Sequence, residues 1–427
     1  MSRSIRFIHA ADLHLGAPLR GLKNLSPRWA DRIFKAILEA YDKLISVACS
    51  EQVDFVIFAG DVFDTTRPSF LEFTHFVKGL KALQDQGILV YLCTGNHDPY
   101  TSWSTDFEHL PTNVNIFSPH NASYFTYEKE GEVLAVLGGR SYYSQTFPHD
   151  ESIIKGLRRA ELYEHANVEA PFALGVVHTG LHFDAVKAPA KLSELHACGL
   201  DYWALGHIHK RWQDSEEDPH VAYSGVIQGR DIKEAGPRGV NLVTLQEYAP
   251  NKIEFVPCSA VVWQMFDYDI GKHSTLAELQ AGIMRALFAL NGNAYCEEMC
   301  TRITLTGESS LARHLRDPHI VEDLRCSLND EYSSFYCDAI INKTHLPSLE
   351  LLSNMEKGVG GEGGFLSLLS KHSERRLACT NDIFDKLQED FVRLRLRTGN
   401  VNTTRLAQFE KESLSVVQDL LIQRRPS

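Results

Sequence analysis

The chain has 427 residues, which is enough for two or three domains with sizeable cores. Apolar residues make up 44% of the chain and charged residues 23%, and this ordinary globular composition excludes a largely disordered or fibrous protein. The formal net charge of −12 argues against nonspecific coating of nucleic acid, although divalent cations held at an acidic site would offset that charge locally.

The sequence carries no signal for membrane insertion or export. No run approaches the roughly 18 apolar residues that a spanning helix needs, and the N-terminal MSRSIRFIHAADLHLG lacks the apolar stretch of a signal peptide. The nine cysteines are scattered, with only Cys296 and Cys300 close together, which favours reduced thiols. We therefore expect a soluble, cytoplasmic protein with no membrane association.

The first half of the chain alternates strand-like and helix-like stretches. Runs of β-branched and aromatic residues predict strands, and apolar residues that recur at helical spacing predict helices. The strands are expected at Ile5–Ala11, Val53–Ala59, Ile88–Cys93, Val133–Leu137, Phe172–Val177 and Tyr202–Leu205. The helices are expected from Pro27 to about Cys49 and at Phe70–Gln86. This alternation predicts a layered α/β domain whose central strands are buried on both faces.

The pattern changes at Trp263, after which a smaller α+β unit is expected. Its strands are predicted at 263–270, 295–305 and 333–341, with helices at Leu276–Leu290 and near Leu311–Leu328. The glycine-rich GVGGEGG at 358–364 predicts a hinge, and two amphipathic helices are expected after it. The sequence is thus divided into three parts, 1–258, 259–350 and 351–427.

Five polar clusters each follow a predicted strand. Ligands of open α/β sheets bind beyond the carboxyl ends of the strands, so these clusters form the candidate site. Glycine directly precedes the polar residue in three of them, and it permits a sharp turn and a close approach of the backbone to an ion or phosphate. The clusters contain Asp12 and His14; Asp61 and Asp64; Asn96, His97 and Asp98; His178; and His207 and His209.

The spacing and the residue types indicate a metal centre. Residues i and i+2 of an extended segment point the same way, so Asp12 and His14 can present two ligands on one side, as can His207 and His209. Carboxylate, imidazole and amide ligands without thiolate suit manganese, iron or zinc. Two ions that share a bridging carboxylate, for which Asp61 is the candidate, would clamp a phosphate for in-line attack. Any one of these residues alone is better explained as a turn or core residue, so the prediction depends on the whole set.

The ordered set D-x-H, GDxxD, GNHD, H and GHxH resembles the calcineurin-like metallophosphoesterase superfamily. Within that superfamily the chain resembles the SbcD-type DNA repair exonucleases, in particular their YhaO-like branch. The motifs span residues 12–209, and the similarity extends to about residue 255. The resemblance implies an α/β fold, a four-layer α/β/β/α metallophosphoesterase sandwich, here with a smaller α+β cap domain and C-terminal helices. It also implies two divalent metal ions, most often Mn²⁺.

Carried over position by position, the resemblance implies roles for ten residues. The metal ligands would be Asp12, His14, Asp61, Asn96, His178, His207 and His209, with Asp61 shared between the two ions. His97 and Asp98 would be the catalytic residues. His97 would position the scissile phosphate or protonate the leaving alkoxide. Asp98 and Asp64 would orient the imidazoles and the backbone of the turns. For both residues, a purely structural role in the turn is an equal alternative.

The resemblance also implies a hydrolase of phosphoester bonds, a DNA exonuclease or endonuclease subunit that acts in DNA repair with an SbcC-like, coiled-coil ATPase. GNHD in place of the GNHE of serine/threonine phosphatases points away from phosphoprotein substrates. Residues 1–258 would be catalytic, 259–350 would orient the substrate, and the helices of 351–427 would dock on the partner. The sequence leaves open whether the protein forms a homodimer. The alternatives are a small-molecule phosphodiesterase or nucleotidase, and an ATPase adaptor with a secondary metal site.

Three features outside the motif set have two interpretations each. The segment Gly225–Gly239 carries Arg230, Lys233 and Arg238, which either contact substrate phosphates or belong to a solvated hairpin. His182, four residues after His178, is an extra ligand or an unrelated histidine. His9, on the opposite face of its strand from Asp12, is expected to pack in the core.

Overall fold

The computed structural model describes residues 3–17, 26–103, 107–148, 150–184, 188, 190–291, 298–330 and 334–347. The glycine-rich hinge and the C-terminal helices expected from the sequence lie outside these residues. No helix among the described residues is long and apolar enough to cross a membrane. The described residues divide into two compact units, one within 1–265, 288–302 and 332–338, the other within 266–287, 303–331 and 339–347. The three-part division expected from the sequence stays a prediction.

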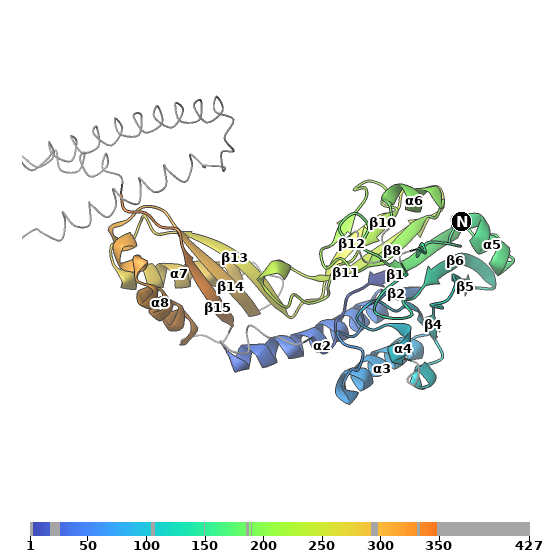
Figure 1. Cartoon of the computed structure of the whole chain (residues 1–427), viewed down its shortest axis with the longest axis horizontal. Helices are drawn as coiled ribbons and strands as arrows, with labels where there is room; N and C mark the ends of the chain where they lie inside the picture. The colour runs from blue at the N-terminus through green and yellow to red at the C-terminus, as the bar shows by residue number, and fades with distance from the viewer. Residues whose placement is uncertain are drawn as a thin grey trace, which may run out of the picture. The chain divides into compact units, whose positions relative to one another are not determined.

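Two six-stranded sheets form most of the first unit (Figure 1). The first sheet has, in spatial order, β12 (Lys252–Pro257), β11 (Gly239–Gln246), β1 (Ser4–Ala10), β2 (Phe55–Ala59), β3 (Leu89–Cys93) and β4 (Val114–Ile116). The second sheet has β5 (Ser123–Lys129), β6 (Glu132–Arg140), β7 (Phe172–His178), β8 (Tyr202–Gly206), β10 (Val221–Tyr223) and β9 (Trp212–Gln213).

The central strands of both sheets run parallel. In the first sheet, β1 pairs with β2 and β2 with β3 in parallel, and Ala59 lies opposite Cys93. In the second, β7 and β8 pair in parallel, and His178 lies opposite Gly206. Parallel neighbours end at the same edge of a sheet, so the segments that follow these strands gather at one edge.

Helices cover the outer faces of both sheets. The residues of α2 (Pro27–Ser50) and α3 (Phe70–Asp85) pack on the first sheet, where Tyr41, Leu44 and Phe76 share a core with Val56 and Phe58. The shorter α5 (Arg159–Ala166) and α6 (Leu192–Ala197) pack on the second sheet through Leu162 and Leu195. Figure 1 shows these helix pairs on opposite sides of the two sheets. The α/β/β/α sandwich expected from the sequence is confirmed.

The two sheets face each other across a separate apolar core. Alternate residues of a strand point to opposite faces, so Phe7 and Phe55 lie between the sheets, whereas Ile8 and Val56 face the helices. The rings of Phe7 and Phe55 stack with centroids 4.8 Å apart. A fully buried side chain of this size stabilises the fold by about 1.5–3 kcal/mol. This burial on both faces explains why the strands read as continuous apolar runs.

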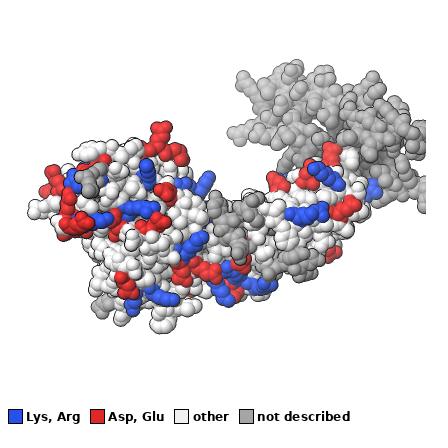
Figure 2. Space-filling view, turned by 180° about the vertical axis from the view of Figure 1, so that it is seen from behind, with Lys and Arg blue, Asp and Glu red and all other residues white. Residues whose placement is uncertain are grey.

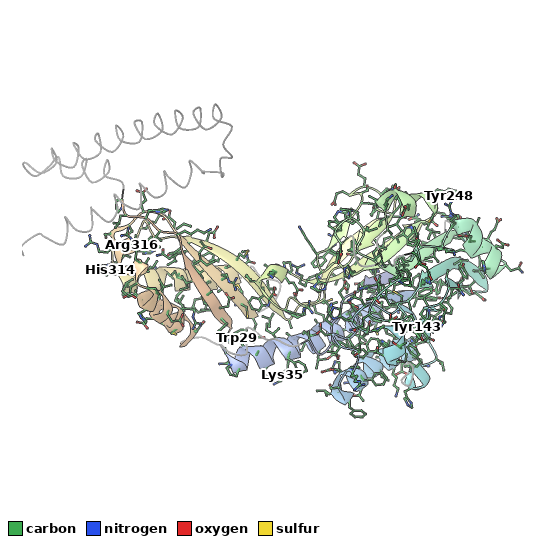
Figure 3. All side chains as sticks on the ribbon, in the orientation of Figure 1. Trp29, Lys35, Tyr143, Tyr248, His314 and Arg316 are labelled. Carbon is green, nitrogen blue, oxygen red and sulfur yellow. The ribbon has the colours of Figure 1, made fainter. Side chains whose placement is uncertain are left out.

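The two long helices begin at recognisable caps. Ser26 precedes α2 and its hydroxyl accepts a hydrogen bond from the Trp29 amide, and Pro27 occupies the first helical position. Ser69 and Glu72 form a capping box at the start of α3. Trp29, labelled on α2 in Figure 3, is buried against Tyr336, with ring centroids 5.7 Å apart.

The later part of the chain has the predicted order of strands and helices. A three-stranded sheet comprises β13 (Val261–Asp269), β14 (Glu298–Thr306) and β15 (Phe335–Asn342), with α7 (Leu276–Asn291) between the first two in sequence. The helix expected near Leu311–Leu328 is interrupted. It consists of the 3-10 helix η3 (Ser310–Arg316) and then α8 (Pro318–Asp330), because proline disfavours helical backbone in the residue before it and begins the next helix.

The sequence did not predict the strands β4, β5 and β9 to β12 or the helices α5 and α6. Three further short segments were not predicted either. They are α4 (Tyr100–Trp103) and the 3-10 turns η1 (Phe107–His109) and η2 (Ile232–Glu234).

His9 is a buried polar bridge between the sheets, as expected for a core histidine. Its Nδ1 lies 2.8 Å from the Tyr202 hydroxyl and its Nε2 lies 3.1 Å from the Leu205 carbonyl, so β1 is joined to β8. Burial lowers the pKa of His9 to about 3, although the Leu205 carbonyl opposes this shift. His9 is therefore neutral in the folded protein near neutral pH.

Acid should weaken the fold through His9. Its pKa is lower in the folded chain than the ordinary value of 6.5, so its contribution is complete above pH 6.5 and is lost as the pH falls toward 3. The loss is at most about 1.4 kcal/mol per pH unit. Urea unfolding of wild type and His9→Asn across this range should show a flatter pH dependence in the variant. An equal pH dependence would contradict the assignment, and the exposed His120→Asn serves as the control.

Candidate metal centre

The predicted ligands gather at the carboxyl ends of the parallel strands. Asp12 and His14 follow β1, Asp61 follows β2, and Asn96 follows β3 in the first sheet. In the second sheet, His178 ends β7, and His207 and His209 follow β8. The Asp12 carboxylate accepts the backbone N–H of His207 at 3.0 Å, so it fastens the two sheets together at this edge. All seven predicted ligands therefore lie at one place, contributed by both sheets.

The turns that carry these ligands have unusual backbone. Asp12, His14, Asp61 and His207 have φ values of 52°, 47°, 51° and 99°, a region that residues other than glycine rarely occupy. Such conformations persist only where the surrounding structure imposes them, and they cluster at functional sites. Here the hydrogen bonds from the Asp12 and His14 amides to the Gly60 and Asp61 carbonyls, each 3.1 Å, hold the two turns together.

One half of the centre consists of Asp12, His14 and His209. Ligand atoms of these three residues all lie within 4.8 Å of one another. The Nε2 atoms of His14 and His209 are 3.1 Å apart, and His14 Nε2 lies 3.9 Å from Asp61 Oδ2. Asp12 and His14 are buried and His209 is partly buried, so solvent could reach this half of the centre only on the side of His209.

The other half consists of Asn96, His178 and His207, with Asp61 between the halves. Asn96 Oδ1 lies 3.2 Å from His178 Nε2 and 3.2 Å from His207 Nδ1. Asp61 Oδ2 lies 3.3 Å from the same His178 Nε2. Asp61 is thus near ligand atoms of both halves, as a bridging carboxylate must be.

The second nitrogen of each of these imidazoles already has an acceptor. His209 Nδ1 lies 2.7 Å from Glu234 Oε1, and His14 Nδ1 lies 2.9 Å from Asp64 Oδ1. The corresponding acceptors are the Ala59 carbonyl for His178 Nδ1, at 2.9 Å, and Asp184 Oδ2 for His207 Nε2, at 3.0 Å. An imidazole that donates from one nitrogen leaves a lone pair on the other.

The other ring nitrogens consequently converge on one space, where His178 carries a proton in the metal-free protein. His14 Nε2 faces His209 Nε2, and His178 Nε2 faces the oxygens of Asp61 and Asn96. Acceptors that face one another are stabilised by a cation, and histidine ligands in metal sites carry this kind of partner on the other nitrogen. The donor set of imidazole, carboxylate and amide fits a divalent ion such as Mn²⁺, Fe²⁺ or Zn²⁺.

Charges within the centre shift several pKa values. Burial disfavours the charged form of His178, but the nearby Asp61 carboxylate outweighs burial and raises the pKa of His178 to about 9. For Asp61, burial favours the neutral form, yet His178 outweighs it and holds the pKa of this carboxyl well below its usual range. Burial lowers the pKa of His14, and burial together with His178 lowers that of His207.

The two predicted catalytic residues have different surroundings. His97 is partly exposed at the edge of the centre, with its ring centroid 4.9 Å from that of His14. Its Nδ1 lies 2.9 Å from the Asp64 carbonyl, which leaves Nε2 for a substrate. Asp98 is buried and accepts hydrogen bonds from the amides of Val62, Phe63 and Gly95. Asp98 therefore joins the turns after β2 and β3, and it acts on backbone instead of on a ligand.

Sequence patterns did not reveal the carboxylates that support the histidines. Glu234 and Asp184 stand 25 and 23 residues from their partners His209 and His207, and no local motif marks either one. Asp64 was singled out, and it contacts His14 as expected of a residue that orients an imidazole. His182 is exposed and packs against Phe183, with ring centroids 4.0 Å apart, and it belongs to none of the candidate ligand groups among the described residues.

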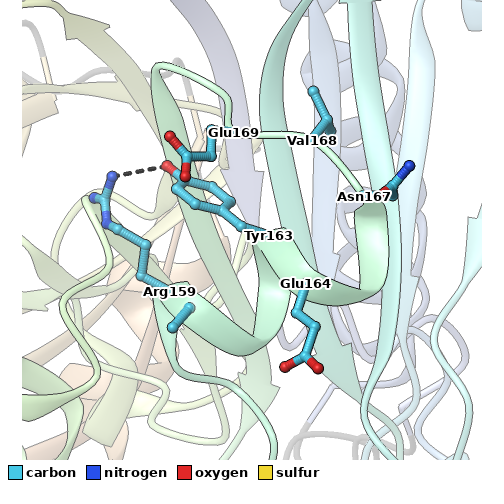
Figure 4. Close-up of a pocket in the computed structure, with 7 residues that line it drawn as sticks. Arg159, Tyr163, Glu164, Asn167, Val168 and Glu169 are labelled. Atoms are coloured by element: carbon cyan, nitrogen blue, oxygen red, sulfur yellow. Dashed lines mark hydrogen bonds between the residues drawn. The ribbon is translucent and has the colours of Figure 1, made fainter.

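A separate hollow on the described surface lies away from the centre. A space of about 790 Å³ opens beside α5 and is drawn in Figure 4. Its Arg159 is already engaged by the Tyr163 hydroxyl at 2.9 Å and by an ion pair with Asp201. No group of possible metal ligands lies there among the described residues. The edge of the parallel strands remains the candidate site.

Metal binding should release a proton from His178. Its pKa of about 9 means that the metal-free protein binds a proton which ligation must displace. The apparent affinity for Mn²⁺ should therefore rise by up to about tenfold per pH unit toward pH 9 and then level off. Anaerobic calorimetry in buffers of different ionisation enthalpy would count the released protons. A count of zero below pH 9 would contradict the prediction, and His165→Ala on α5 should behave as wild type.

The glycine before His207 should tolerate no side chain. A Cβ at Gly206 would lie 1.9 Å from the Ala59 carbonyl oxygen, which belongs to the neighbouring sheet and cannot move without separating the strands. We expect Gly206→Ala to cost about 1–3 kcal/mol or more and to lose metal binding. Gly271→Ala is the matched control, because its backbone is not left-handed and its new Cβ would come no closer than 3.1 Å to the exposed Asp269 side chain. Thermal unfolding with and without Mn²⁺ compares the two, and equal stabilities would refute the steric argument.

Comparisons with known proteins agree with this geometry. Residues 5–211, which include all five motifs, match the family model described as calcineurin-like phosphoesterase. The chain is 33% identical over 319 residues to the Bacillus subtilis protein named uncharacterized metallophosphoesterase YhaO, covering 72% of this chain and 73% of that one.

More distant relatives are named as nucleases or DNA repair proteins. A component of the nuclease SbcCD of Bacillus subtilis is 27% identical over 273 residues, or 54% of this chain and 64% of that one. DNA double-strand break repair protein Mre11 of Saccharolobus solfataricus is 25% identical over 226 residues, or 51% and 52%. The motif set, the fold and these matches agree, and the chain belongs to the calcineurin-like metallophosphoesterase family of metal-dependent phosphoester hydrolases.

Proposed function

We propose that this protein is a phosphodiesterase that holds two divalent metal ions, with Mn²⁺ as the expected metal, and that its substrate is DNA. The proposal depends on the convergence of histidine nitrogens with Asp12, Asp61 and Asn96 at one sheet edge. The ligands would be divided as described, with Asp12, His14 and His209 on one ion, Asn96, His178 and His207 on the other, and Asp61 on both. When bound, the two ions supply an activated water and neutralise the phosphate oxygens.

The chain's own residues would orient the substrate and move the proton. His97 Nε2 is directed away from the Asp64 carbonyl that fixes Nδ1, so it can reach a phosphodiester at the centre. Imidazole exchanges a proton readily near neutral pH, which suits protonation of the leaving alkoxide. The His97 amide donates to Asp61 Oδ1 at 2.9 Å, and this bond sets the position of the histidine relative to the bridge. Asp98 would fix the turn that carries His97 through the hydrogen bonds that it accepts from three backbone amides.

DNA as the substrate is supported by the relatives and by the family's chemistry. Two of the relatives are named as part of a nuclease and as a DNA double-strand break repair protein. We infer an exonuclease or endonuclease role in DNA repair, in the cytoplasm, with an SbcC-like coiled-coil ATPase as partner. Residues 259–350 would orient the polymer, and 351–427 would dock on the partner.

Surface charge favours a partner for binding of long DNA. The formal net charge is −12, and affinity for duplex DNA comes largely from contacts of basic residues with phosphates. On the face drawn in Figure 2, Lys and Arg side chains lie among Asp and Glu side chains, and the described residues form no continuous basic surface there. The same observation favours the second candidate function, hydrolysis of a small phosphodiester or nucleotide.

Replacement of His97 should separate catalysis from metal binding. His97→Ala removes the proposed general acid but none of the proposed ligands, so kcat should fall by about 10²–10⁴-fold while Mn²⁺ binding persists. The assay is Mn²⁺-dependent shortening of end-labelled linear DNA, run beside a small chromogenic phosphodiester. His165→Ala on α5 is the matched control. Wild-type turnover by His97→Ala would remove His97 from the mechanism.

The same assay discriminates between the substrates. Shortening of DNA by wild type but not by His97→Ala would support the nuclease. Cleavage of the small diester alone, also after addition of an SbcC-like ATPase, would favour the second candidate. Cleavage of neither substrate would count against both functions.

A further inference from the structure

Two arginines of the basic loop Gly225–Gly239, Arg230 and Arg238, bind carboxylates and carbonyls of the protein itself. The sequence left open whether Arg230, Lys233 and Arg238 contact substrate phosphates. Arg238 donates to the carbonyls of His209 at 3.1 Å, Glu234 at 3.1 Å and Ala235 at 2.8 Å. All three nitrogens of its guanidinium are thus engaged by backbone, and the side chain supports the turn that carries His209.

Arg230 binds two carboxylates from different parts of the chain. Its Nη1 donates to Asp64 Oδ1 at 3.2 Å, in the turn after β2. Its Nη2 and Nε donate to Glu234 Oε1 at 2.9 Å and Oε2 at 3.3 Å, and Nη2 also lies 3.0 Å from His209 Nδ1. The Arg230 side chain is only 20% exposed, and the two carboxylates are 14% and 11% exposed. A bidentate guanidinium suits this bridge, because ammonium is a point charge.

These two carboxylates are the partners of two proposed metal ligands. Asp64 lies 2.9 Å from His14 Nδ1, and Glu234 lies 2.7 Å from His209 Nδ1. A continuous chain of contacts therefore runs from His14 through Asp64, Arg230 and Glu234 to His209. Its two ends meet again at the centre, where the Nε2 atoms are 3.1 Å apart.

We propose that Arg230 is a positioning residue for one half of the metal centre. By holding Asp64 and Glu234 together, it sets the orientation of the His14 and His209 rings so that both present a lone pair to the same ion. The inference depends on the proposed metal binding and is independent of the substrate. Without Arg230, two partly buried carboxylates would lose their shared counter-charge and their separation would no longer be fixed.

The contacts favour this role over a phosphate contact. A substrate phosphate would have to displace one of the carboxylates that Arg230 already binds. The other half of the centre has different supports, since His178 relies on the Ala59 carbonyl and His207 on Asp184. Loss of Arg230 should therefore affect one ion and spare the other.

The test measures metal binding in the full-length protein. We would titrate wild type, Arg230→Ala and Arg230→Lys with Mn²⁺ in the absence of substrate, using calorimetry for affinity and electron paramagnetic resonance for spin coupling between the two ions. Arg230→Ala should bind one ion as wild type does and the other about 10–100-fold more weakly. The coupled signal should be lost at two equivalents of metal. Arg230→Lys should recover part of the affinity.

Lys233→Ala is the matched control, because Lys233 is an exposed cation of the same loop. It should keep both affinities. Glu234→Gln tests the same bridge in case Arg230→Ala does not fold. Its amide oxygen can still accept a hydrogen bond from His209, but the ion pair with Arg230 is removed. It should weaken the same ion by a smaller factor.

Three outcomes would overturn the proposal. They are two ions bound by Arg230→Ala with wild-type affinity, equal weakening of both ions, and a raised KM for a phosphodiester with unchanged metal binding. The last would assign Arg230 to the substrate. A wild-type protein that binds fewer than two ions would instead refute the proposed function, so the two failures are distinguishable.

Discussion

The centre depends on histidine nitrogens and on carboxylate and amide oxygens that converge on one space. His178, His207 and His209 each place one ring nitrogen on a hydrogen-bond partner, which is the Ala59 carbonyl, Asp184 or Glu234. His14 Nδ1 lies 2.9 Å from Asp64, and the other nitrogen of each of the four rings faces inward. Asp61 and Asn96 add oxygens to the same space. Assembling these groups costs free energy through repulsion and desolvation, and a bound cation offsets it. The strained turns at the strand ends serve this assembly.

The sandwich makes that assembly possible. Two sheets with parallel central strands pack face to face through an apolar core, so the carboxyl ends of β1, β2 and β3 meet those of β7 and β8. Neither sheet alone carries a complete ligand set for either ion, because Asp61 is shared and each half draws a histidine from the second sheet. Bonds such as that from the His207 amide to Asp12 then fasten the two edges.

Charge on a loop is a poor guide to its role. Arg230 and Arg238 suggest contact with a polyanion when they are read as sequence, but the fold directs both of them inward, toward carboxylates and carbonyls of the centre. A guanidinium between two carboxylates fixes geometry more than it attracts ligands. The surface that would bind DNA must then come from other residues of this chain or from a partner, in keeping with the mixed charges of Figure 2.

The sequence by itself determined the layered α/β class, the main strands and helices, and the seven candidate ligands, because doubly buried strands read as apolar runs and ligands follow them in short motifs. The strands β4, β5 and β9 to β12 and the helices α5 and α6 were not predicted from the sequence. Strands as short as β4 and β9, with two or three residues, cannot show an alternating pattern. Only the tertiary structure decided that Asp184 and Glu234 support His207 and His209. These pairings join residues more than 20 positions apart, through contacts that exist only once the two sheets have packed.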